Sequence, residues 1–68
     1  MQTLFNLKQS IQREFVQHIA KQAQCDVREM YDDKDFNNVA LLCVDVVGTQ
    51  QQLNVLDIVF EKLQMYAY

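Results

Sequence analysis

The chain has 68 residues, a formal net charge of −3, a hydrophobic content of 50%, one glycine, no proline and no tryptophan. This composition excludes disordered, collagen-like and disulfide-dense secreted proteins. The length allows a single domain, residues 1–68, and a domain of this size buries only about 60% of the surface of its unfolded chain, so we expect a partner chain to supplement its core.

Residues 1–8 lack the basic start and the continuous apolar run of a signal peptide. The longest mostly apolar stretch, residues 39–47, is too short to cross a membrane. We therefore expect a cytoplasmic protein in which Cys25 and Cys43 are reduced. Both cysteines fall on predicted strands of one hairpin, and the sequence leaves open whether they approach each other.

Apolar residues recur every three or four positions from Leu4 to Ala23, which predicts an amphipathic helix of about twenty residues. The opposite face of this helix is rich in glutamine and nearly free of acids. Its candidate contact residues are Lys8, Arg13, Gln17 and Lys21.

The apolar pattern then changes to alternation, which predicts a strand over residues 25–31. Asp and Asn dominate residues 32–38, and these residue types favour turns. Residues 39–47 are apolar at nearly every position, which predicts a strand that is covered on both faces. The two strands form an antiparallel hairpin.

Gly48, the only glycine, precedes the second helix at a turn where a positive φ is expected. Thr49 and Gln52 have the spacing of a capping box, so we expect the helix to begin there. Its apolar residues extend well beyond one face, and the chain ends on the unusually apolar residues 65–68.

The predicted fold is therefore α+β in the order helix, strand, strand, helix, with both helices packed on the hairpin. An isolated hairpin is marginally stable, and one face of the strand at residues 39–47 stays uncovered. We expect a homodimer to complete or cover the sheet. The expected interface residues are Val39, Leu41, Phe60, Leu63, Met65, Tyr66 and Tyr68.

Several short patterns connect this chain to a known family: Leu7-Lys8 at the helix, Val27-x-Glu29 on the strand, and Val55-Leu56-Asp57-x-Val59-Phe60 on the last helix. With Asp35-Phe36 before the apolar strand, the chain resembles the YlxP-like family of small bacterial proteins over residues 7–66. The resemblance implies a ferredoxin-like arrangement of helices on a sheet and a ribosome-associated or RNA-linked role, and no catalytic residues. This family begins with a strand, for which residues 1–6 are expected to be too short.

The sequence offers little for catalysis or metal binding. Asp33-x-Asp35-x-Asn37 has the spacing that opens a calcium loop, but Asn38 and Val44 stand where such a loop needs glycine and glutamate. His18 is the only histidine and has no metal-ligand partners at a suitable spacing. We expect no enzyme activity, no metal and no cofactor.

Two binding functions remain. The first is a protein-interaction module, a small regulator, adaptor or inhibitor, whose acidic turn docks a partner protein through Asp32, Asp33, Asp35 and Phe36. The alternative is RNA or ribosome binding through the basic face of the first helix, defined by Lys8, Arg13, Gln17 and Lys21.

Overall fold

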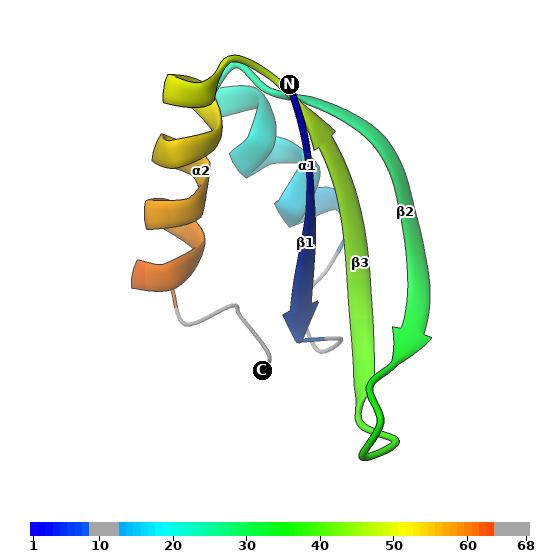
Figure 1. Ribbon diagram of the computed structural model, residues 1–68. Coiled ribbons are helices and arrows are strands. Elements are labelled where there is room, and N and C mark those ends of the chain that lie inside the picture. The colour runs from blue at the N-terminus through cyan, green and yellow to red at the C-terminus, as the bar shows by residue number, and fades with distance from the viewer. Residues whose placement is uncertain (9–12, 64–68) are drawn as a thin grey trace.

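The structure is a computed structural model that describes residues 1–8 and 13–63. Its elements are β1 (Gln2–Lys8), α1 (Arg13–Gln22), β2 (Asp26–Lys34), β3 (Ala40–Val47) and α2 (Gln50–Lys62). The strands form one antiparallel sheet in the order β1-β3-β2, so β3 lies in the centre (Figure 1). The predicted α+β class is confirmed.

The predicted first helix is wrong at its N-terminal end, where residues 2–8 form β1. Phe5 and Leu7 face the core, whereas Leu4 and Asn6 face outward, which is the alternation of a strand with one buried face. The three-residue interval between Leu4 and Leu7 is helical only by coincidence. The chain therefore does begin with a strand, contrary to the expectation that residues 1–6 are too short for one.

Helix α1 is consequently shorter than predicted and buries Val16, Ile19 and Ala20, while Phe15 is exposed. It ends in a double hydrogen bond: the Cys25 N–H donates to the Ala20 carbonyl and the Gln24 N–H to the Lys21 carbonyl. This is the Schellman pattern, and Gln24 takes the left-handed conformation with φ 61° that glycine usually supplies. The cap turns the chain directly into β2.

The hairpin of β2 and β3 is confirmed, but β2 continues to Lys34, so the connection is confined to the five residues 35–39. The Asp35 carboxylate accepts hydrogen bonds from the Asn37 and Val39 N–H groups at 2.8 and 3.0 Å. Asn38 adopts a φ of 67°, which Asn tolerates better than most residues. The hairpin extends past the end of β1 (Figure 1).

The predicted capping box at α2 is confirmed. The Gln52 N–H donates to Thr49 Oγ1 at 3.1 Å, and the Thr49 N–H donates to Gln52 Oε1 at 2.9 Å. Gly48 does not have a positive φ, so that expectation is wrong. Instead, a Cβ there would lie 3.3 Å from Cys25 Sγ, and glycine allows this close approach.

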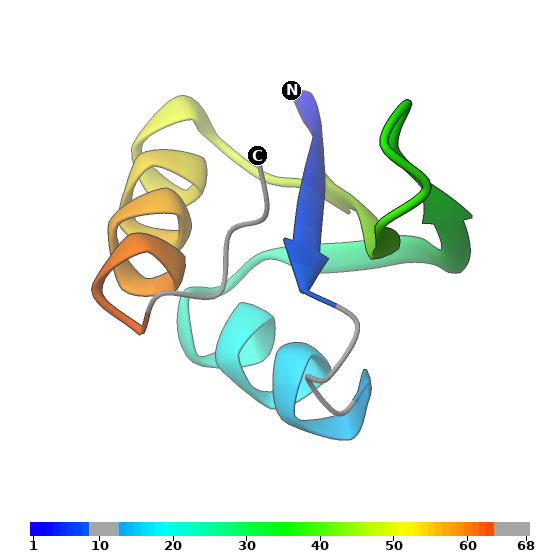
Figure 2. The same cartoon turned by 90° about the horizontal axis from the view of Figure 1, so that it is seen from below.

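Both helices pack on the same face of the sheet, and no described element covers the other face (Figure 2). The core lies between the helices and the sheet, and residues of β2 only flank it. The core residues are Phe5, Leu7, Val16, Ile19, Ala20, Cys25, Leu42, Val44, Val46, Leu53, Leu56 and Phe60. The third strand comes from the N-terminus of the same chain. A second copy is therefore not needed to extend the hairpin into a three-stranded sheet.

Candidate protein-binding surface

The uncovered face of the sheet is built by alternate residues of its strands. Along the register, Asn6, Cys43 and Tyr31 form one row, and Leu4, Asp45 and Glu29 form the next. Leu41 and Cys43 lie on the central strand and are buried although no helix covers them. The helices leave this side of β3 uncovered, as expected, but these two side chains are buried because the neighbouring strands shield them.

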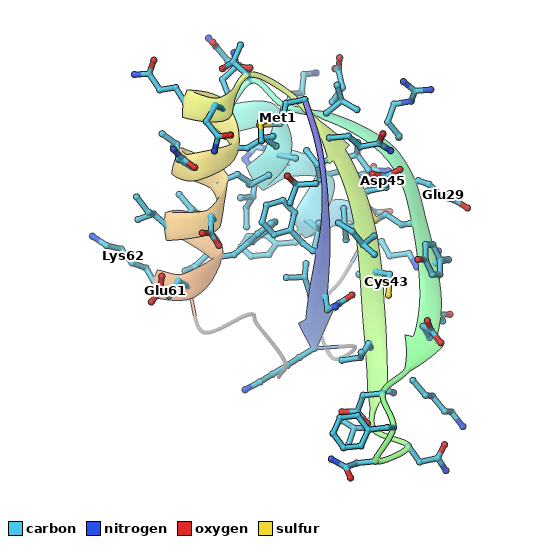
Figure 3. The ribbon with its side chains drawn as sticks, viewed as in Figure 1. Met1, Glu29, Cys43, Asp45, Glu61 and Lys62 are labelled. Atoms are coloured by element: carbon cyan, nitrogen blue, oxygen red, sulfur yellow. The ribbon has the colours of Figure 1, made fainter. Side chains whose placement is uncertain are left out.

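Like charges meet on this face. Glu29 and Asp45 are direct cross-strand neighbours, and such a pair of acids destabilises a sheet. They lie at the same level on β2 and β3 (Figure 3). With Gln2, Leu4 and Tyr31 they line a shallow depression of about 380 Å³. The Asp45 carboxylate also accepts a hydrogen bond from the side-chain amide of Gln2 on β1, whereas Glu29 adds only a second negative charge beside it.

The tip of the hairpin carries the most exposed large apolar side chain of the described residues. Phe36 is 97% exposed, and it sits in the turn that the Asp35 carboxylate holds by its hydrogen bonds. Asp33, on the uncovered face, is separated from Phe36 by only two residues. We call the residues Glu29, Tyr31, Asp33, Phe36 and Asp45 the hairpin surface.

The predicted acidic docking loop is split by the extension of β2. Adjacent residues of a strand face opposite sides, so Asp32 and Asp33 do not form one patch. Asp32 lies on the helix side, where its carboxylate pairs with Arg13 at 2.9 Å. Asp33 lies on the uncovered side and accepts a hydrogen bond from the Lys34 N–H. Sequence reasoning missed Glu29, Tyr31 and Asp45, although Asp45 in an apolar strand was a visible signal.

The two cysteines are free, buried and on opposite faces of the sheet, because Cys25 belongs to the core and Cys43 to the uncovered face. The Cys43 thiol donates to Asn6 Oδ1 at 3.3 Å. Burial raises the pKa of both thiols, and the charge of Asp33 raises the pKa of Cys43 further. His18 is exposed on α1, across the sheet from Cys43, so these two residues do not form a nucleophile pair.

The predicted dimer interface is not brought together as a surface. Phe60 is fully buried and packs against Phe5 with ring centroids 5.2 Å apart, so it belongs to the core of the monomer. Leu41 is buried as well. Val39 and Leu63 are exposed, near the hairpin turn and at the end of α2. The remaining interface predictions lie outside the described residues: Met65, Tyr66 and Tyr68.

The predicted basic helix face is also divided. Lys8 belongs to β1, whereas Arg13, Gln17 and Lys21 belong to α1. The guanidinium of Arg13 is already paired with Asp32, which reduces the positive charge that this helix presents. Gln17 and Lys21 remain exposed.

Among residues 1–8 and 13–63, no cluster of three or more His, Cys, Asp or Glu side chains has the arrangement of a metal site. Within the same part of the chain, no helix is long and apolar enough to span a membrane. A scan against protein-family models and searches of curated proteins and solved structures found no match to this chain. The resemblance to the YlxP-like family stays a prediction.

Proposed function

We propose that this chain is a protein-interaction domain that acts by binding, without catalysis, and that a basic partner protein docks on the hairpin surface. The observation that carries the proposal is Phe36, which is 97% exposed on a turn held in place by two hydrogen bonds to Asp35. Its ring contributes nothing to the core. Burying such a side chain in a partner contributes about 1.5–3 kcal/mol.

The charges of the hairpin surface define the partner. Glu29, Asp33 and Asp45 are all acidic, and two of them are direct cross-strand neighbours. A cationic side chain between Glu29 and Asp45 relieves their repulsion, and the ring of Tyr31 at the edge of the same depression stacks well against a guanidinium. Arginine-rich or lysine-rich protein surfaces with an apolar pocket for Phe36 fit this arrangement.

Nucleic acid fits the same surface poorly, because phosphates are repelled by its three carboxylates. The basic residues of the alternative site are split between β1 and α1. We therefore favour a protein partner, and RNA binding becomes an outcome that the experiment distinguishes.

The experiment selects a random peptide display library on the immobilised protein. We expect enrichment of peptides that combine Lys or Arg with a bulky apolar residue. The Phe36→Ala variant is expected to weaken the selected peptides by about 10-fold or more, from the burial energy above. Absence of enrichment, or selected peptides that bind Phe36→Ala as tightly as the unchanged chain, contradicts the proposal.

Asp32 and Asp33 supply a matched pair of controls, since they are chemically identical neighbours on opposite faces. Asp33→Asn should weaken peptide binding several-fold, whereas Asp32→Asn should leave it within twofold. Equal effects of the two substitutions would refute the assignment of the face. If instead RNA binds at low salt and Lys21→Glu abolishes this binding, the nucleic-acid alternative is correct.

Homodimerisation stays a separate prediction. Sedimentation equilibrium over a range of concentrations measures it directly. A dimer that Phe36→Ala dissociates would identify the second copy as an occupant of the hairpin surface, in place of a basic partner.

A further inference from the structure

The outer edge of β1 presents backbone groups that no described residue pairs. The Gly48 N–H donates to the Met1 carbonyl at 3.0 Å, which fixes the hydrogen-bonded pairs between β1 and β3. Because the backbone groups of successive strand residues alternate in direction, Thr3, Phe5 and Leu7 bond to β3. The N–H and C=O groups of the even-numbered residues therefore point away from the sheet. These residues are Gln2, Leu4, Asn6 and Lys8.

The other edge of the sheet is protected against strand addition. Six of the nine residues of β2 are charged, and a register shift interrupts the strand between Val27 and Glu29. Charges and bulges are the usual devices that prevent a further strand from pairing with an edge. Strand β1 carries a single charge, Lys8, and its register is regular throughout. The contrast marks β1 as the edge that can accept a strand.

A groove runs beside this edge, between β1 and α2. It has a volume of about 400 Å³ and is lined by Thr3, Leu4, Phe5, Gln50, Leu53, Asn54 and Asp57. Its apolar residues come mostly from the strand, and its helix wall carries amide and carboxylate groups. Helix α2 lies on the β1 side of the molecule (Figure 1), so a chain in the groove contacts both elements.

We propose that the groove between β1 and α2 binds an extended segment of a partner protein, which adds to the sheet as a fourth strand. Only another extended backbone satisfies a row of alternating donors and acceptors. Such a segment directs alternate apolar side chains toward Leu53 and Phe5.

This site is distinct from the hairpin surface. Phe36 lies in the turn that joins β2 to β3, whereas the groove is lined by residues of β1 and α2. In the sheet, β1 lies on the opposite side of β3 from β2. The substitution Phe36→Ala is therefore expected to leave strand addition unchanged. Failure of one proposal does not imply failure of the other.

The test uses a synthetic peptide, acetyl-Thr-Val-Lys-Val-Arg-Val-Thr-amide, and amide hydrogen exchange of the full chain followed by NMR. We expect the Leu4 and Asn6 amides to exchange rapidly in the free protein and at least tenfold more slowly with the peptide. The Asp32 amide points outward from the protected edge by the same alternation, so its exchange should not change. It serves as the internal control.

Two further measurements isolate the backbone contribution. Two peptides are N-methylated at alternate amides, one at the odd-numbered positions and one at the even-numbered positions, so each has lost the N–H donors along one side. The peptide that has lost the donors facing β1 should not bind, whereas the other should. Leu4→Pro removes one outward N–H at an edge position where proline is tolerated. In this variant, the peptide should no longer slow the exchange of the Asn6 amide. The N-methylated peptides decide the question if Leu4→Pro does not fold.

Three results would overturn the proposal. The first is protection of Leu4 and Asn6 in the free protein, which would show that the edge is already occupied. The second is protection of Asp32 in place of Leu4, and the third is equal binding of both N-methylated peptides and the unmodified one.

Discussion

The contact between Phe5 and Phe60 offers the sharpest test of the core. Phe60 is completely buried, and its ring meets that of Phe5 edge to face, at an interplanar angle of 71°. Truncation of a buried phenylalanine to alanine costs about 3–5 kcal/mol. A domain of this length has a free energy of unfolding of about 3–10 kcal/mol, at about 0.05–0.15 kcal/mol per residue. Phe60→Ala should therefore leave much of the chain unfolded.

The milder substitution Phe60→Leu keeps enough stability for measurement by urea unfolding, followed by circular dichroism. Double substitution with Phe5→Leu should reveal a coupling of about 0.5–1.5 kcal/mol, which is typical of an aromatic pair. The matched control is Leu63→Ala, since Leu63 is half exposed three residues further along the chain, and should cost much less.

The outcome also separates a core residue from an interface residue. If Phe60 serves the core, the effect of Phe60→Leu is independent of protein concentration. If Phe60→Leu leaves the monomer as stable as before and only weakens self-association, the placement of Phe60 in the core is refuted.

Three further results are expected. Thr49→Ala removes the side-chain half of the capping box and should lower the free energy of unfolding by about 1 kcal/mol, measured by urea unfolding. Asp32→Asn breaks the ion pair with Arg13, but both side chains are about half exposed, so the loss should stay below about 1 kcal/mol and shrink further in high salt. Burial raises the pKa of Cys25 and Cys43, so folding opposes the ionisation of both thiols. The stability that the buried thiols contribute is therefore complete below their unfolded pKa of 9.0 and declines as the pH rises through their folded pKa. Both thiols should react slowly with a disulfide reagent at pH 8 unless urea is added, and rapid reaction of the folded chain would contradict this.

The comparison of sequence and structure is most instructive at the N-terminus. Leu4 and Leu7 fit the spacing of a helix, and Phe5 and Leu7 fit the spacing of a strand equally well. Local sequence cannot choose between these patterns, because the decisive interaction is the pairing of β1 with β3, about 40 residues away along the chain. The sequence showed that both faces of β3 are apolar. One reason is that β3 is the central strand of the sheet, between β2 and the unexpected strand β1.

The candidate surface, too, was predicted in part from local sequence and depends in part on contacts between distant residues. Phe36 and the acids of the turn were predicted from residue types alone, and Phe36 is the most exposed large apolar side chain of the described residues. The separation of Asp32 from Asp33 follows only from the length of β2, and the meeting of Glu29 with Asp45 only from the register of β2 on β3. Register places every residue of a strand on one face or the other, so a patch on a sheet depends on it completely.

By itself, therefore, the sequence determined the features whose physics is local: the capping box of Thr49 and Gln52, the Asx-rich turn, the apolar strand, predicted at residues 39–47 and found at 40–47, and the α+β class. Only the tertiary structure decided that residues 2–8 form a strand, that this strand lies at an edge of the sheet, and that Phe60 is a core residue. These features depend on contacts between residues far apart in the chain, and the free energy of such contacts comes from burial and pairing that a short stretch of sequence does not contain.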